Sequence, residues 1–376
     1  MTPPSLRSLG VDAVYGLPLD GVAVVEVAPD LAPLLADAHH RLRRRRAGIH
    51  RGDGTVVDVR GVAVEPAPPV DRWVPPDDDV VAALAGAQLP VVLAGPGVVL
   101  DDAVPGLHAL AAAGSLGVLN TWGAKGVFDW RSRHHLATVG LQALDFSRGG
   151  LTEADLVVAT GVDEREALAE WRLAPVVEVA PGSLGPLAER WGRPRAEIAP
   201  PPLRADLARI TQAGWASGTV PLAPTRVTRH YGLVLGGGGL VAADPGTAGY
   251  WIARTFATTG VGGAQVTADA GAAGFAVACG LVARLLEPSR PVLAVVDAVG
   301  EVHERLLETA ARLGVQVPVE VWSAGGDGDV VDGDAHRQRL EHLVGSGGRA
   351  SVATDPTQLD EMIAAAGPVI AWSGPH

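Results

Sequence analysis

The chain has 376 residues, of which 47% are hydrophobic, and this length is enough for two or three domains with buried cores. Acidic residues outnumber basic ones by 42 to 30, and the net charge of −12 disfavours non-specific binding of nucleic acid. Cys279 is the single cysteine, which excludes an internal disulfide framework. No apolar run reaches the ~18 residues that a membrane span needs, and the first residues lack a signal-peptide pattern. We therefore expect a cytoplasmic protein with neither membrane nor nucleic-acid partners.

Residues 1–72 predict a truncated α/β segment. A strand is expected near residues 11–15 and a helix over 31–42, and a Pro- and Asp-rich stretch follows toward residue 79. The basic run HHRLRRRR, residues 39–46, has two interpretations: a patch for phosphate or nucleic acid, or the basic carbonyl end of a helix. The acidic chain around it favours the helix end.

Residues 78–200 alternate between helical patterns and apolar strands such as PVVLAGPGV and ADLVVATGV, which predicts a parallel sheet covered by helices on both faces. A Pro-rich connection with one helical pattern separates this domain from residues 224–376, which alternate again and end in an expected strand, PVIAW. The predicted fold class is α/β, with two doubly wound parallel-sheet domains in series after the truncated N-terminal segment.

Several fragments resemble the thiamine diphosphate-dependent enzymes of the acetolactate synthase and 2-oxoacid decarboxylase group. Three fragments are similar, in the same order, to the family's central domain: PVVLAGPGV, NTWGAKGVFDWRSRHHLATVG and EADLVVATGVDEREA. Lys125 falls in the family's lysine position. Two fragments are similar to the family's diphosphate-binding domain: GLVAADPGTAGYW and GAAGFAVACGLVARLLEPSRPVLAVV. The start of the family's pyrimidine-binding domain resembles LRSLGVDAVYGLPLDG. The resemblance implies these three domains at 78–200, 224–376 and 1–72.

The resemblance also implies where thiamine diphosphate and Mg²⁺ would bind. The cofactor-binding positions are Asp244, Gly246, Thr247, Gly271, Ala273 and Gly274. The turn ADPGTAGYW could offer backbone N–H groups and a hydroxyl to a phosphate, or be an ordinary turn in which Asp244 caps a helix.

Other family positions carry residues that cannot do the family's chemistry. The metal-binding aspartate falls on Ala298, next to the only nearby candidate, Asp297, and the amide pair falls near Ser323 and Ala324. The bulky residue that bends the cofactor is Ala273. Glu26 is the only candidate for the catalytic carboxylate, because it follows a strand and precedes a helix, and a surface or capping role is the alternative.

Two functions follow from this comparison. The first is a degenerate, non-catalytic homologue that acts as a binding, scaffold or regulatory subunit. The second is an active acetolactate synthase-like carboligase or decarboxylase of 2-oxo acids, with Mg²⁺ held by Asp297 or by the Asp327–Asp334 loop and with a partner chain completing the site. The resemblance implies a homodimer, and a full-length paralogue is a further candidate partner.

Two further motifs resemble ligand-binding loops. GPG at residues 95–97 lies between a strand and a helix, and some members of the family bind FAD or another adenine nucleotide in this domain. GGDGDVVDGDAH, residues 325–336, has alternating aspartates but not the spacing of a twelve-residue Ca²⁺ loop, so a solvated loop is the expected structure.

Overall fold

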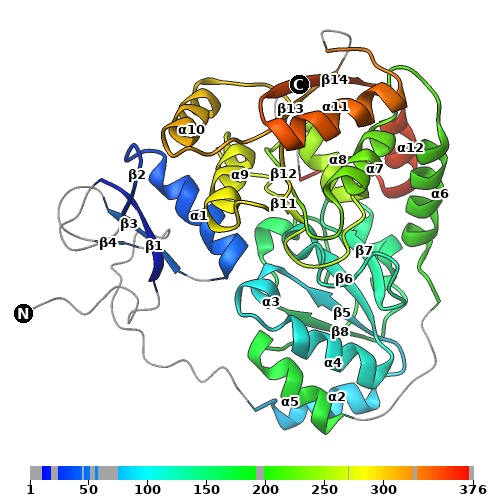
Figure 1. The fold of residues 1–376 in the computed structure, drawn as a ribbon. Helices are drawn as coiled ribbons and strands as arrows, with labels where there is room; N and C mark the ends of the chain where they lie inside the picture. Colours follow the sequence, from blue (N-terminus) through cyan, green and yellow to red (C-terminus); the bar gives the residue numbers. More distant parts are fainter. Residues whose placement is uncertain are drawn as a thin grey trace, which may run out of the picture.

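The structure is a computed structural model that describes residues 11–17, 24–44, 46–50, 56–57, 75–191, 199–269, 271–324 and 328–371. Figure 1 shows three α/β units: a small N-terminal unit, a central unit and a C-terminal unit. Each contains one sheet, and the central and C-terminal sheets have five parallel strands each. This confirms the predicted fold class.

The N-terminal unit is a four-stranded sheet in the order β2-β1-β3-β4. Its elements are β1 (Val11–Gly16), β2 (Val24–Glu26), α1 (Ala32–Arg43), β3 (Arg46–His50) and β4 (Val56–Val57). The first three strands are parallel, and β4 runs antiparallel to β3. Helix α1 packs on α9 of the C-terminal unit, where Leu35 and Phe275 belong to one buried cluster.

The basic run lies at the end of α1, as the helix-end interpretation predicts. His40, Arg41 and Arg43 stand in its last turn, where cations favour the carbonyl end of the helix dipole. Arg41 pairs with Asp37 and Arg44 pairs with Asp102, so these charges have acidic partners within the protein. Residue 45 and the side chain of residue 46 lie outside the described residues.

The central sheet has the order β7-β6-β5-β8-β9. Its elements are α2 (Asp78–Gly86), β5 (Pro90–Ala94), α3 (Pro96–Leu100), α4 (Val104–Gly114), β6 (Gly117–Thr121), η2 (Trp122–Ala124), β7 (His135–Val139), η3 (Ser147–Leu151), β8 (Leu156–Thr160), η4 (Glu164–Glu166), β9 (Val176–Glu178), η5 (Pro181–Ser183) and α5 (Leu184–Arg190). Because side chains alternate along a strand, Val92 packs toward α4 and α5 while Leu93 packs toward η3 and α6, and both faces are covered.

The C-terminal sheet has the order β11-β10-β12-β13-β14. After the connecting helix α6 (Pro202–Ala216), its elements are α7 (Pro224–Leu235), β10 (Leu240–Ala243), α8 (Thr247–Thr255), β11 (Ala264–Val266), α9 (Phe275–Leu286), β12 (Val292–Val296), α10 (Glu301–Arg312), β13 (Val319–Ala324), α11 (Gly333–Ser346), β14 (Arg349–Thr354) and α12 (Gln358–Ala366). Helices α7, α8, α11 and α12 share one core cluster, and α9, α10 and α1 share the other.

The expected last strand, PVIAW, is wrong. In the part of it that the structure describes, residues 368–371, one isolated bridge joins Val369 to Gln142 of the central unit. The segment does not add a strand to β14. Its backbone bonds go to the loop after β7: Ala143 donates to the Pro368 carbonyl and Ile370 donates to the Leu141 carbonyl. Across the described ranges, no helix combines the length and the apolar character that crossing a membrane requires.

Candidate functional site

The strand orders place a candidate site at one edge of each five-stranded sheet. In a doubly wound sheet, ligands bind beyond the carboxyl ends of the two strands at which the winding direction reverses. These are β10 and β12 in the C-terminal sheet, and β5 and β8 in the central sheet. Asp244 follows β10 and Asp297 follows β12, so both carboxylates lie at the C-terminal reversal point.

Asp297 caps the N-terminus of α8. Its two carboxylate oxygens accept hydrogen bonds from the backbone N–H groups of Thr247 and Ala248, the latter at 2.9 Å. Gly246 has φ of +142° and lies so close that a Cβ atom built on it would be 2.2 Å from Asp297 Oδ2. The glycine in ADPGTAGYW is therefore required by the approach of a carboxylate from the protein itself.

Asp244 caps a second helix, α9. It accepts hydrogen bonds from the backbone N–H groups of Gly274 and Ala276, both at 2.7 Å, and it also contacts His303 Nε2 at 2.7 Å. His303 Nδ1 accepts a bond from the Gly300 N–H, so its ring proton is on Nε2 and points to Asp244. The interpretation of Asp244 as the cap of its own strand-to-helix turn is wrong, because Asp297 caps α8 and Asp244 caps α9.

The remaining predicted positions lie around the same edge. Gly271 and Ala273 are exposed, and the Gly271 N–H donates to Asp269 Oδ1 at 2.9 Å. Glu26 lies elsewhere: it is exposed at the end of β2, paired in register with Gly16. It does not line the cleft described below, and its predicted catalytic role stays a prediction.

The aspartates of residues 325–336 have partners within the protein wherever they are described, apart from Asp334, which is exposed. Asp329 pairs with Arg339, and Asp332 caps α11 by accepting from the Ala335 N–H. Asp327 lies outside the described residues. Among the residues that are described, no group of three or more His, Cys, Asp or Glu side chains is arranged to hold a metal ion.

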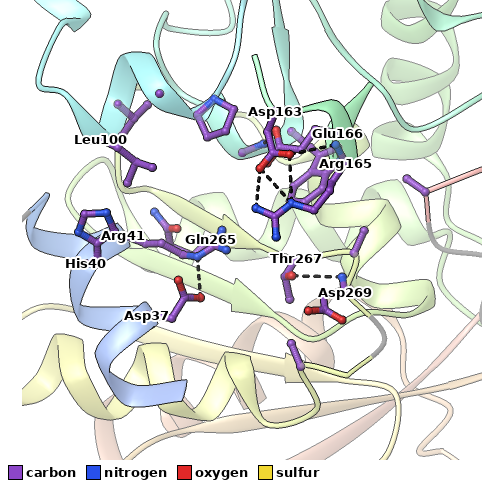
Figure 2. A pocket seen from close by; sticks show the side chains of 18 of the residues that line it. Asp37, His40, Arg41, Leu100, Asp163, Arg165, Glu166, Gln265, Thr267 and Asp269 are labelled. Atoms are coloured by element: carbon purple, nitrogen blue, oxygen red, sulfur yellow. Dashed lines mark hydrogen bonds and ion pairs between the residues drawn. The ribbon is translucent and has the colours of Figure 1, made fainter. Parts of the chain in front are cut away.

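A cleft of about 910 Å³ lies at the reversal point of the central sheet, where all three units meet. Figure 2 shows that α1 contributes Asp37, His40 and Arg41, the central unit contributes Asp163, Arg165 and Glu166, and the C-terminal unit contributes Gln265, Thr267 and Asp269. Arg165 makes a two-pronged ion pair with Asp163, and Arg41 pairs with Asp37. Both cations of the cleft are thus neutralised by neighbours.

Glu166 is the most perturbed acid in the cleft. It is 3% exposed, and it accepts hydrogen bonds from the Thr121 hydroxyl and from the Gly123 N–H at 2.9 Å. Burial raises the pKa of Glu166 to about 7, although these two bonds act in the opposite direction. Sequence reasoning missed it, but a signal was present: DERE, residues 163–166, lies in the loop after a buried strand at the reversal point.

The GPG turn also lines the cleft, but its amides are used within the protein. The Gly95 N–H donates to the Thr160 carbonyl and the Gly97 N–H donates to the Gly161 carbonyl, both at 2.9 Å. A Cβ atom on Gly95 would lie 2.3 Å from the Gly161 oxygen. Close packing of the loops after β5 and β8 therefore explains these glycines without a nucleotide.

Comparison with known proteins identifies the central unit. Residues 78–180 match the family model of the thiamine pyrophosphate enzyme central domain, which supports a thiamine diphosphate-dependent enzyme family. No curated protein matches the chain significantly. The family implies thiamine diphosphate as the cofactor.

The site at the carboxyl ends of β10 and β12 in the C-terminal sheet does not suit thiamine diphosphate. A diphosphate is stabilised where free helix N–H groups point at it, and both helix N-termini here already bind carboxylates. The resemblance aligns Ala298 with the metal-binding aspartate and Ala273 with the residue that bends the cofactor. Ala298 has no side-chain ligand atom, and the side chain of Ala273 is a single methyl group. The described residues therefore do not fit the group.

Proposed function

We propose that this chain is a non-catalytic member of the thiamine diphosphate enzyme family that acts as a binding or regulatory protein without thiamine diphosphate. One observation carries the proposal: Asp297 and Asp244 occupy the two helix N-termini at the reversal point of the C-terminal sheet. Each carboxylate accepts hydrogen bonds from the first N–H groups of its helix and places a negative charge there, as a bound phosphate would.

Electrostatics argues in the same direction. A diphosphate placed at this edge would meet two carboxylates instead of unpaired N–H groups, and like charges in a partly desolvated site repel strongly. A metal ion could offset this repulsion, but it would need oxygen ligands beyond Asp297, and the side chain of Ala298 supplies none.

The cleft between the three units is the place where the proposed protein would bind a ligand. Its lining carries five acidic residues and two arginines, namely Asp37, Asp101, Asp163, Glu166, Asp269, Arg41 and Arg165. This excess of negative charge, together with the engaged amides of the GPG turn, disfavours an adenine nucleotide with free phosphates. It favours a neutral or cationic polar molecule.

Titration calorimetry with thiamine diphosphate and excess Mg²⁺ tests the proposal. We expect no binding heat from the wild-type protein. Micromolar affinity, worth about 8 kcal/mol, would overturn the proposal. The variant D297N then identifies the cause: if it stays folded and abolishes such binding, Asp297 is a metal ligand. The alternative function, an active 2-oxo acid carboligase or decarboxylase, would then be tested by assaying turnover of 2-oxo acids.

The assembly is proposed from the resemblance alone. We propose a homodimer, or a complex with a full-length paralogue, because the resemblance implies that one chain's first domain meets another's third domain. Light scattering on the purified chain distinguishes the two: a monomer that becomes a complex only when the paralogue is added would support the second.

A further inference from the structure

A second cavity, of about 360 Å³, lies between the central unit, α6 and α8, separate from the cleft described above. The two have no lining residue in common. Its lining carries four cationic side chains, Lys125, Arg131, Arg204 and Arg254, together with the His135 imidazole, and no carboxylate. In a chain of net charge −12, a cavity with this lining has a charge opposite to that of the whole protein.

Two of these cations have no carboxylate partner among the described residues. Lys125 is the only lysine of the chain and is 8% exposed. Arg204 donates to the backbone carbonyls of Ser132 and His135. Both charges act on the His135 imidazole in the same lining: burial first, then Lys125 and Arg204, lower the pKa of His135 to about 3. The two cations therefore face the same space.

The other two cations are already paired. Arg131 binds Asp129, and Arg254 binds Asp145 in a fully buried ion pair. Even so, Arg254 Nε is buried with no hydrogen-bond partner, and so is Trp215 Nε1 in the same lining. Nearly all buried donors in proteins have a hydrogen-bond partner, so these two N–H groups are exceptions on side chains that line the cavity.

The rest of the lining is apolar and aromatic. Trp130 and Trp215 meet edge to face at 5.6 Å between ring centroids, and Leu136, Leu207 and Phe256 complete the wall. Small-molecule sites have this composition: a mostly apolar wall with a few convergent polar groups. The volume suits a compact ligand.

We propose that this cavity binds a small organic carboxylate with an aromatic or branched aliphatic body. The carboxylate would accept from Lys125 and Arg204, while the apolar body packs on the two tryptophans. This site is independent of the proposal on thiamine diphosphate, since neither Asp244 nor Asp297 lines it.

Binding should be coupled to proton uptake. Burial and the charge of Arg254 lower the pKa of Lys125 to about 7, so most of the lysine is neutral at pH 8. A bound carboxylate favours the ammonium form, hence affinity should fall as the pH rises above 7. The other charged groups around Lys125 are His135 on β7, Arg204 on α6, the Arg254–Asp145 pair and the Arg131–Asp129 pair.

The test is calorimetry with benzoate, phenylacetate and 3-methylbutanoate in a zwitterionic buffer, with benzamide as the neutral control. We expect at least one carboxylate to bind, and benzamide to bind far more weakly. Because charge-assisted hydrogen bonds are lost, K125M and R204M should each weaken binding by about tenfold or more. R209M, on the same helix as Arg204 but outside the cavity, should bind like the wild type.

Three results would overturn the proposal: no binding of any of the three carboxylates by the folded wild type at millimolar concentrations, equal binding of benzoate and benzamide, or unchanged affinity in folded K125M and R204M. Circular dichroism and the melting temperature of each variant establish that it is folded. The fluorescence of W215F, compared with the wild type during titration, provides a second readout of whether the ligand enters this cavity.

Discussion

The Asp145 carboxylate accepts two hydrogen bonds from one nitrogen of the Arg254 guanidinium, at 2.8 and 2.9 Å, and both side chains are fully buried. Asp145 also accepts from the backbone N–H groups of Leu141 and Gln142, and Arg254 donates to the Thr138 carbonyl. The pair joins the loop after β7 of the central unit to α8 of the C-terminal unit. It fixes how these two units sit on each other.

Removal of one partner of this pair should be strongly destabilising. R254M leaves the Asp145 charge buried without a counter-ion, and we expect a loss of about 3–5 kcal/mol in the free energy of unfolding. Urea denaturation measures it. R349M, which removes an exposed partner of Glu304, is the matched control and should cost under about 1 kcal/mol. Equal effects of the two variants would contradict the role assigned to the pair.

The sequence predicts the parts of the fold that depend on local pattern. Apolar runs such as residues 90–94 and 292–296 become fully buried strands, and helix α2 begins at Asp78 after the capping side chain of Asp77. Because parallel strands end at the same edge of the sheet, Thr247, after β10, meets Asp297, after β12. Gly274, before α9, meets Asp244 at the same edge.

Contacts between distant segments could not be read in this way. Asp145 and Arg254 are 109 positions apart, and nothing local distinguishes either from a surface residue. The same holds for Glu166, whose burial depends on Thr121 and Gly123 of another strand end. PVIAW has the composition of a strand, but its hydrogen-bond partners lie in the central unit and not on a neighbouring strand.

The single lysine allows a direct measurement of its protonation. Protein labelled with ¹³C at the lysine ε-carbon should give one lysine signal, and its titration should have a midpoint near pH 7, because burial and Arg254 lower the pKa of Lys125 to about 7. A midpoint near 10.5, the ordinary value, would show that the ammonium is solvated and would remove the coupling to proton uptake proposed above.

The same shift predicts a pH dependence of stability. Between pH 7 and 10.5 the unfolded chain binds a proton on Lys125 that the folded chain has lost. The contribution of Lys125 to the free energy of unfolding therefore rises with pH, by up to about 1.4 kcal/mol per pH unit. K125M should be more stable than the wild type at pH 7, and this advantage should shrink toward pH 10. The difference between R209M and the wild type should not change in this window.

Glu166 should show a dependence of the opposite sign. The folded protein keeps the Glu166 proton up to about pH 7, whereas the unfolded chain releases it near 4.5. Ionisation therefore costs stability as the pH rises from 4.5 to 7, by up to about 1.4 kcal/mol per pH unit. E166Q is neutral throughout, so its advantage over the wild type should grow across this range and then stay constant. E164Q, on the same turn and exposed, should show no such trend.

The cap on α8 can be tested separately from cofactor binding. D297A removes the acceptors for the Thr247 and Ala248 N–H groups, and loss of a cap costs about 0.5–2 kcal/mol. D334A, in the exposed first turn of α11, should change the stability by less than about 0.5 kcal/mol. A D297A variant as stable as the wild type would show that Asp297 is not engaged with α8 and is free for another ligand.

The last prediction concerns a series of buried, hydrogen-bonded side chains in the C-terminal unit. Arg226 Nε–H donates to His230 Nε2, so the His230 proton is on Nδ1 and points to His336 Nδ1 at 2.7 Å. The His336 proton is then on Nε2 and points to Glu320 Oε1 at 3.1 Å. Burial, with the charges of nearby groups, lowers the pKa of His230 to about 3, in agreement with a neutral ring.

The other Glu320 oxygen accepts from the Tyr231 hydroxyl, which itself accepts from Trp322 Nε1 at 2.6 Å. Both ends of this hydrogen-bonded series therefore meet at the Glu320 carboxylate. E320A leaves the Tyr231 and His336 donors buried without an acceptor, at a cost of about 1–3 kcal/mol each. E320Q keeps one acceptor oxygen and most of the volume, so it should be less destabilising in urea denaturation. If E320A is no worse than E320Q, the carboxylate is not the acceptor that holds this chain of side chains together.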